Sequence, residues 1–331
     1  MIEKIADRMI NGNDTTWEMN IDAFDWNPGV GLYGIWNAYK KTGEQRYFDF
    51  LTKWFDKHLR EAYKQITINS VAPLLTAAEM YHETGNEDYY KVCCDLADYV
   101  TQKAPLTSAG GLEHTVTEKV EGFAEQMWAD TLFMACLFAA KFGVYSGRKE
   151  YCDFAVKQLK THLKYLCDNE TGLFFHGYSC ITKDHLSGVH WGRANAWIIY
   201  SSCEIMETLG DFDGIDEVKA YIKRHADALR RVQRATGGFA TVLDCEDSYT
   251  ETSAAAGIAA GLKKAEKLGI CADVKDMYEK TEELVKASVN ENGEVMHVST
   301  GTPIMKDVHA YMDIPCRPTL YGQALSILTL L

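Results

Sequence analysis

The sequence predicts an all-α protein, an (α/α)6 barrel of six inner and six outer helices. Three observations predict this fold: a motif that recurs along the chain, an alternation between two kinds of helix, and a matching alternation of short and long connections. The chain has 331 residues, of which 47% are hydrophobic, and this is enough for one sizeable core. We therefore expect a single domain that spans residues 1–331.

The recurring motif is a helix that ends at a glycine and is followed within a few residues by a second helix. Its clearest copies are A-Y-K-K-T-G-E-Q-R-Y-F at 38–48 and M-Y-H-E-T-G-N-E-D-Y-Y at 80–90. Weaker copies begin at residues 140, 206 and 265. Because glycine readily adopts the left-handed conformation that ends a helix, each copy is typical of a helical hairpin.

The two helices of each hairpin differ in composition. The segment before the glycine is mostly small and apolar, which indicates a buried inner helix, whereas the segment after it is amphipathic and charged, which indicates a half-exposed outer helix. The expected inner helices span 28–41, 70–84, 129–143, 191–209, 252–268 and 317–331. The expected outer helices span 1–11, 45–60, 87–104, 148–167, 213–234 and 272–290.

The connections from an outer to the next inner helix are all long. They span 12–27, 61–69, 105–128, 168–190, 235–251 and 291–316. The topology places all of them at one end of the barrel, together with the first turn of every inner helix. Long loops on a rigid scaffold commonly carry function, so we expect the functional site at this end.

Composition excludes several classes of protein. The net charge is -13 and the basic residues are scattered, so a nucleic-acid partner is not expected. No apolar run approaches the roughly 20 residues of a membrane span, and four charges in the first eight residues do not fit a signal peptide. The ten cysteines lie mostly in apolar helical stretches without paired metal-ligand spacing. We expect a cytoplasmic protein with reduced thiols and no metal site.

The stretch E-Q-M-W-A-D-T-L-F-M at 125–134 places Asp130 at the start of an apolar inner helix. One interpretation makes Asp130 an N-terminal helix residue that accepts backbone hydrogen bonds. The other makes it an acid with a raised pKa at the edge of an apolar cavity, as proton-transfer enzymes require. The position of Asp130 at the end of the barrel that carries the long loops keeps both interpretations open.

A second group of candidates opens the fourth inner helix, in H-W-G-R-A-N-A-W at 190–197. Arg193 is costly to bury unless it is paired, so it either binds an internal carboxylate or awaits an anionic ligand. Trp191 and Trp197 are either core residues or a wall on which a sugar ring stacks.

Loop histidines and further aromatic residues belong to the same end of the predicted barrel. His114 and His176 lie in the connections 105–128 and 168–190. A loop histidine is more often structural or exposed than catalytic. The stretch F-D-W-N-P-G-V-G-L-Y-G-I-W at 24–36 adds two tryptophans and Tyr33. A site rich in Trp, Tyr, His and Arg is typical of carbohydrate binding.

These stretches resemble the unsaturated rhamnogalacturonyl and glucuronyl hydrolases, and most closely glycoside hydrolase family 105. The matching stretches follow one another along nearly the whole chain: V-G-L-Y-G at 30–34, G-G-L-E-H-T at 110–115, Q-M-W-A-D-T-L-F-M-A at 126–135, F-F-H-G at 174–177, W-G-R-A-N-A-W at 191–197 and Y-T-E-T-S-A-A-A at 249–256. The family fold is the (α/α)6 barrel, which agrees with the helix pattern above.

The resemblance implies an enzyme, without a metal or organic cofactor, that hydrates the C4=C5 double bond of an unsaturated uronic acid at a non-reducing end. The substrate would be a small unsaturated oligosaccharide, and the adjacent sugar would be released. Asp130 matches the general acid of the family. The resemblance also implies substrate contacts for Tyr33, Asn69, His114, Trp128, His176, Trp191, Arg193 and Trp197.

The sequence departs from the family pattern at Asn69, where the family usually has a second Asp. Asn keeps the size and an acceptor oxygen but cannot be ionised. This difference leaves a sugar-binding relative without catalysis as the alternative to the hydrolase. Another (α/α)6 carbohydrate enzyme, such as a sugar epimerase, is a third option, and the lack of a histidine pair at comparable helix starts disfavours it. The spacing from His114 to Trp128 also exceeds the usual one, which predicts an altered lid over the site.

Overall fold

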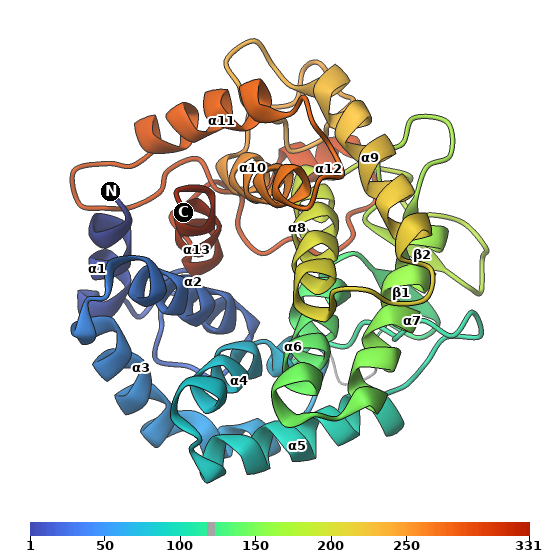
Figure 1. Ribbon diagram of the computed structural model, residues 1–331. Coiled ribbons are helices and arrows are strands. Elements are labelled where there is room, and N and C mark those ends of the chain that lie inside the picture. Colours follow the sequence, from blue (N-terminus) through green and yellow to red (C-terminus); the bar gives the residue numbers. More distant parts are fainter. Residues whose placement is uncertain (118–122) are drawn as a thin grey trace.

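Two kinds of helix alternate along the chain in the computed structural model, which describes residues 1–117 and 123–331. Within these residues, six amphipathic helices form an outer ring around six mostly apolar inner helices (Figure 1). The predicted (α/α)6 barrel is confirmed, and most predicted helix ends lie within a few residues of the observed ones. The outer helices are α1 (Ile2–Asn11), α3 (Gln45–His58), α5 (Glu87–Gln102), α7 (Lys149–Leu166), α9 (Ile215–Val232) and α11 (Lys275–Ala287).

The inner helices close into a ring because each one packs against the next and the last packs against the first. In ring order they are α2 (Trp26–Thr42), α4 (Pro73–Thr84), α6 (Leu137–Ser146), α8 (Gly192–Leu209), α10 (Thr252–Lys267) and α13 (Leu320–Thr329). Small residues allow close approach where α2 meets α13. A Cβ atom on Gly34 would lie 2.6 Å from the Cα atom of Ala324, so this contact requires glycine.

The turns from inner to outer helices are short and follow the recurring motif. Gly43 ends α2 with a φ of 71° and Gly85 ends α4 with a φ of 67°, and the backbone N–H of each donates to the carbonyl four residues earlier. Only glycine adopts this left-handed conformation without strain, which explains the two clearest copies of the motif.

Several short elements in the long connections were not predicted from the sequence. Two strands, β1 (Gln126–Trp128) and β2 (Gly177–Ser179), pair antiparallel and join the third connection to the fourth. The remaining short elements are the 3-10 helices η1 (Leu59–Tyr63) and η2 (Asn69–Val71), the π-helix η3 (Leu132–Cys136), which opens the third inner helix, and α12 (Val308–Met312) in the last connection. Residues 118–122 of the predicted connection 105–128 lie outside the described residues.

A buried ionic network lies in the C-terminal halves of the inner helices, at the end of the barrel opposite the long connections. Nζ of Lys141 lies 2.9 Å from Glu79 Oε1 and 2.8 Å from Glu204 Oε1, so α4, α6 and α8 are tied together. Burial by itself would raise the pKa of Glu204, but Lys141 and Lys264 outweigh it and lower this pKa to about 2. The carboxylates in turn raise the pKa of Lys141 against the opposing effect of burial.

Candidate active site

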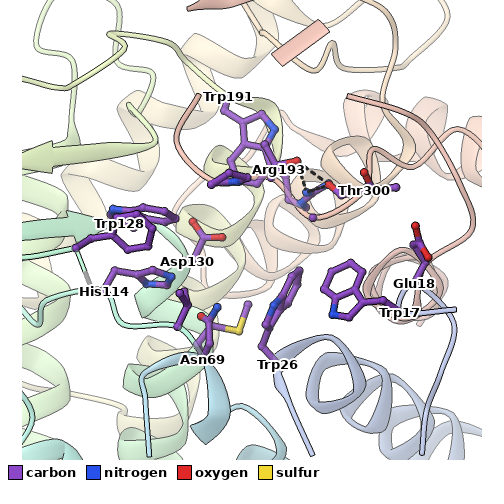
Figure 2. A pocket seen from close by; sticks show the side chains of 16 residues that line it. Trp17, Glu18, Trp26, Asn69, His114, Trp128, Asp130, Trp191, Arg193 and Thr300 are labelled. Atoms are coloured by element: carbon purple, nitrogen blue, oxygen red, sulfur yellow. Dashed lines mark hydrogen bonds between the residues drawn. The ribbon is translucent and has the colours of Figure 1, made fainter. Parts of the chain in front are cut away.

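A cavity of about 470 Å³ lies at the end of the barrel where the inner helices begin. Its wall in the described part of the chain combines aromatic rings with a few polar groups (Figure 2). The lining residues are Trp17, Glu18, Trp26, Asn69, His114, Val116, Phe123, Trp128, Asp130, Met134, Trp191, Arg193, Thr300, Gly301, Thr302 and Pro303. Six of the predicted site residues are therefore brought together in one cavity: Asn69, His114, Trp128, Asp130, Trp191 and Arg193.

The two-stranded sheet positions Asp130. Strand β1 ends at Trp128, the backbone N–H of Ala129 donates to the carbonyl of His176 at 3.0 Å, and helical backbone begins at Asp130. Strand β2 begins directly after His176, so pairing of the strands sets Asp130 beside His176. The π-helix follows at Leu132, and such local widening of a helix is frequent at functional sites.

Asp130 is largely buried, with 15% of its side chain exposed, and His176 Nε2 lies 3.3 Å from its Oδ2 atom. Neither of these two atoms has another hydrogen-bond partner among the described residues. Burial by itself would raise the pKa of Asp130, but His176, and more weakly His114 and Arg193, outweigh it and lower this pKa. The interpretation of Asp130 as an acid with a raised pKa was therefore wrong, because it considered the apolar neighbours and not the imidazoles.

His176 does not line the cavity but lies directly behind Asp130, where it is 1% exposed. Its Nδ1 atom lies 2.7 Å from the hydroxyl oxygen of Tyr311, which α12 contributes. Burial lowers the pKa of His176, so the ring is neutral and carries one proton. If the Tyr311 hydroxyl donates to Nδ1, that proton is on Nε2 and faces Asp130.

His114, Trp128 and Asn69 form one side of the deep end of the cavity. The rings of His114 and Trp128 stack 4.4 Å apart, and His114 Nδ1 lies 3.0 Å from the hydroxyl oxygen of Thr131. Burial lowers the pKa of His114 to about 4, so this imidazole is neutral. The backbone N–H of Asn69 donates to the carbonyl of Thr115, and the residue lines the cavity. Figure 2 shows His114 and Asn69 near Asp130.

Arg193 is 1% exposed, and its two terminal nitrogens are hydrogen-bonded to the protein itself. Nη1 donates to the carbonyl and hydroxyl oxygens of Ser299 at 3.0 and 2.7 Å, and Nη2 donates to the carbonyl of Thr300 at 3.1 Å. The carboxylate of Glu251 lies 3.8 Å away. The guanidinium group thus pairs with carbonyl and hydroxyl oxygens and holds the loop 299–302, whereas the internal carboxylate of the first alternative, Glu251, lies further away.

The predicted aromatic contacts divide between cavity and core. Trp191 lines the cavity and lies 4.4 Å from the guanidinium carbon of Arg193. Trp197 is fully buried and packs against Phe133 with ring centroids 4.8 Å apart. Tyr33 also packs against Phe133, and its hydroxyl group lies 3.4 Å from a Glu204 oxygen. Tyr33 and Trp197 therefore belong to the barrel core rather than to the described wall of the cavity, one or two helical turns below it.

Several lining residues were missed by the sequence analysis. Trp17 and Glu18 come from the first long connection, and the segment 300–303 comes from the last. Tyr311 and Glu251 hold His176 and Arg193 without lining the cavity themselves. The clustering of long connections at one end was the available signal, but it does not say which loop residues point inward.

No group of three or more His, Cys, Asp or Glu side chains in the described ranges 1–117 and 123–331 is arranged to hold a metal ion. None of the helices in the same ranges is long and apolar enough to cross a membrane. The chemical groups that the site offers are thus one deep carboxylate, two neutral imidazoles, an amide and stacked aromatic rings.

Comparisons with known proteins agree with this arrangement. The unsaturated rhamnogalacturonyl hydrolase YesR of Bacillus subtilis (strain 168) is 33% identical over 331 residues, which cover 98% of this chain and 93% of that protein. An unsaturated 3S-rhamnoglycuronyl hydrolase of Alteromonas sp. (strain LOR) is 27% identical over 282 residues, which cover 74% of this chain and 67% of that protein.

Solved structures show the same fold. A possible member of the GH105 family from Salmonella enterica superposes with a TM-score of 0.95 at 30% identity, over 99% of this chain and 91% of that one. The unsaturated glucuronyl hydrolase of Bacillus sp. GL1 superposes with a TM-score of 0.77 at 17% identity, over 99% of this chain and 94% of that one. The model of Glycosyl Hydrolase Family 88 matches residues 1–331, and the chain belongs to that family.

Proposed function

We propose that this protein adds water across the C4=C5 double bond of an unsaturated uronic acid at the non-reducing end of a short oligosaccharide, and so releases the adjacent sugar. The observation that carries this proposal is the deep position of Asp130, one largely buried carboxylate between two neutral imidazoles at the closed end of an aromatic cavity. The curated relatives YesR and the Alteromonas enzyme, named for unsaturated rhamnogalacturonyl and 3S-rhamnoglycuronyl substrates, support the substrate class.

The distribution of carboxylates favours hydration over ordinary glycoside hydrolysis. Ordinary glycosidases place two carboxyl groups on either side of the glycosidic bond. The second carboxylate on the described cavity wall, Glu18, lies beyond Trp17 at the outer end of the cavity (Figure 2). A single acid suffices when the proton goes to carbon, because the same group then accepts a proton from water.

The reaction proceeds by two proton transfers at Asp130. The protonated Asp130 gives its proton to C4, the electrons of the double bond form the new C–H bond, and positive charge develops at C5 and the ring oxygen. Water attacks C5 while Asp130 takes one of its protons, which regenerates the acid and leaves a hemiketal. Opening of the hemiketal exposes C1 as a hemiacetal, which releases the neighbouring sugar, so one water is consumed overall.

Substrate binding itself supplies the protonated acid in this account. In the free enzyme His176 outweighs the opposing effect of burial and lowers the pKa of Asp130, so the carboxyl group is ionised near neutral pH. The uronate brings a second negative charge into the same cavity, and a like charge raises the pKa of a buried carboxyl group. Asp130 therefore gains a proton as the substrate binds, while His114, which lines the cavity, orients the water and the uronate, and His176 holds Asp130 from behind.

We also propose that residues 1–331 form one catalytic domain and that the protein works in the cytoplasm. The family model spans the same residues, and the inner helices close into one ring. All ten cysteines are free thiols in the structure, as expected in a reducing compartment.

The substitution Asp130→Asn tests the role of Asp130. It removes the transferable proton from a group of nearly the same shape, so kcat on a lyase-made unsaturated disaccharide should fall by two decades or more, about the scale of a general acid. Binding of the disaccharide, measured by calorimetry, should persist. Asp244→Asn is the matched control, because Asp244 pairs with His190 away from the cavity. Near-native turnover by Asp130→Asn would remove Asp130 from the mechanism.

A further inference from the structure

The outer end of the cavity, which the reaction at Asp130 does not use, is built mainly from Trp17, Glu18 and Gly301. Trp17 is 40% exposed, whereas Trp128, at the deep end, is 4% exposed. The unsaturated ring has to sit at the deep end, beside Asp130. The sugar attached to it therefore points toward Trp17.

The turn that carries Trp17 and Glu18 is fixed to two inner helices. The side-chain amide of Asn27, at the start of α2, donates to the carbonyl of Trp17 at 2.7 Å and to that of Glu18 at 3.1 Å. The backbone N–H of Leu320, at the start of α13, donates to the carbonyl of Glu18 at 2.9 Å. An exposed indole on a backbone that is held at three points is a preorganised surface for a ligand.

The indole of Trp17 also contacts neighbouring groups of the protein. Its ring centroid lies 5.4 Å from that of Trp26, and Trp26 stacks on Tyr321 at 5.2 Å. A Cβ atom on Gly301 would lie 2.9 Å from the ring of Trp17, so the loop can approach the indole closely because residue 301 is glycine. The same loop is held by Arg193 through Thr300, which connects the outer end of the cavity to its deep end.

The charges at the outer end do not suit an anionic sugar. The carboxylate of Glu18 lies there, 3.5 Å from the exposed Arg317. Arg193 is the one Arg or Lys on the described cavity wall, and protein oxygens occupy its terminal nitrogens. A sulfate or carboxylate group on the second sugar would approach Glu18 and meet no free cation on that wall.

We propose that Trp17 and Glu18 form the binding site for the second sugar and select an uncharged ring. This inference rests on the proposed function. The apolar face of the ring stacks on the indole of Trp17, and a ring hydroxyl donates to the carboxylate of Glu18. The same carboxylate disfavours a sulfated or acidic sugar by like-charge repulsion, so the two residues determine which oligosaccharides are accepted.

Three substrates with the same unsaturated uronate test this assignment. The first carries a methyl group in place of the second sugar, the second carries an uncharged sugar, and the third carries the same sugar with one sulfate. Wild type should favour the uncharged disaccharide over the sulfated one by about tenfold or more in kcat/KM. Trp17→Ala should reduce kcat/KM for the uncharged disaccharide about fivefold more than for the methyl glycoside, because stacking is lost only where there is a second ring.

Two further variants separate stacking from charge. Trp17→Phe keeps an aromatic face and should recover most of the loss on the uncharged disaccharide. Glu18→Gln removes the negative charge, so the ratio of kcat/KM for the uncharged disaccharide to kcat/KM for the sulfated one should fall about threefold or more. Equal effects of Trp17→Ala on the methyl glycoside and the disaccharide, or a wild-type preference for the sulfated sugar, would overturn the assignment. Absence of wild-type turnover on all three substrates would instead overturn the proposed function.

Discussion

The pKa of Asp130 is subject to two opposite effects, one from His176 in the protein and one from the uronate of the substrate. His176, 3.3 Å away, lowers the pKa of the free carboxyl group, whereas a bound uronate raises it. The neutral state of His176 is compatible with this cycle, because the hydroxyl group of Tyr311 can either donate to Nδ1 or accept from it. The imidazole can then donate to an ionised Asp130 or accept from a protonated one.

This balance predicts two different pH profiles. The profile of kcat/KM reports the free enzyme, in which the pKa of Asp130 is lowered. As the pH rises, Asp130 of the free enzyme loses its proton already in the acidic range, and kcat/KM falls with it. The profile of kcat reports the complex, in which the uronate charge raises that pKa. We expect the alkaline limb of kcat to lie about one pH unit or more above that of kcat/KM. Coincident limbs measured on one unsaturated disaccharide would contradict substrate-assisted protonation.

Asn69 allows an independent test of the same electrostatics. Its amide lines the cavity with Asp130, so Asn69→Asp adds a negative charge near the acid. A second carboxylate raises the pKa of Asp130, and the alkaline limb of kcat should move to higher pH. If Asn69 only holds a sugar hydroxyl, the rate should change by less than about one decade and the limb should stay in place. Asn11→Asp, on the outer helix α1, is the matched control for added charge.

The sequence identified most of the deep site at the level of single residues. The cavity wall includes five predicted residues that lie at or just before the start of an inner helix, and His114 from the connection 105–128; the five are Asn69, Trp128, Asp130, Trp191 and Arg193. Tyr33 and Trp197 do not line it, because an α-helix rises 1.5 Å per residue and these side chains lie further along their helices. A sequence motif alone does not distinguish an aromatic side chain at the cavity wall from one that packs into the core one helical turn below it.

At the scale of elements, the connections were the part that the sequence did not predict. Strands β1 and β2 have three residues each and pair across about 50 positions, so no local alternation signals them. The helix α12, which supplies Tyr311, is also short, with five residues. These elements form because loops from different hairpins meet at one end of the barrel. They depend on contacts between distant parts of the chain, which a local sequence pattern does not show.

Asn195 shows how an inner helix fixes such a connection. Its side-chain oxygen accepts from the backbone N–H of Phe174 at 2.8 Å, and its side-chain nitrogen donates to the carbonyl of Phe174 at 2.8 Å. The same oxygen lies 2.9 Å from His225 Nε2, and burial lowers the pKa of His225 to about 3, so this ring is a neutral donor. Through Phe174 the helix α8 thus positions His176, two residues further along.

The substitution Asn195→Ala should therefore affect both stability and catalysis. It leaves the N–H and C=O groups of Phe174 unpaired in the core, which costs about 2–4 kcal/mol in the free energy of unfolding. The displaced His176 should also lower kcat. Asn37→Ala is the matched control, because Asn37 donates to the carbonyl of Tyr33 within its own helix and does not join that helix to a connection. Thermal unfolding and kcat should be measured on both variants, and an unchanged Tm for Asn195→Ala would contradict the anchoring role.

At the scale of the whole molecule, the alternation of composition was sufficient to predict the barrel. Each hairpin contributes one apolar and one amphipathic helix, and two concentric rings are the arrangement that buries the apolar set completely. The hairpins also give all inner helices the same direction. One end of the barrel therefore collects the loops and the cavity, while the other is held by Lys141 and its two carboxylates.

The most direct test of this account follows the double bond and the released sugar in the same reaction. Hydration removes the double bond before the sugar leaves, so ultraviolet absorbance of the conjugated bond should be lost in a one-to-one ratio with sugar release from an unsaturated disaccharide. Attack on the glycosidic bond would release the sugar with the double bond still present. For the wild type we predict that the amount of double bond lost equals the amount of sugar released, and that both change at the same rate. Release of the sugar while the absorbance persists would contradict hydration by Asp130.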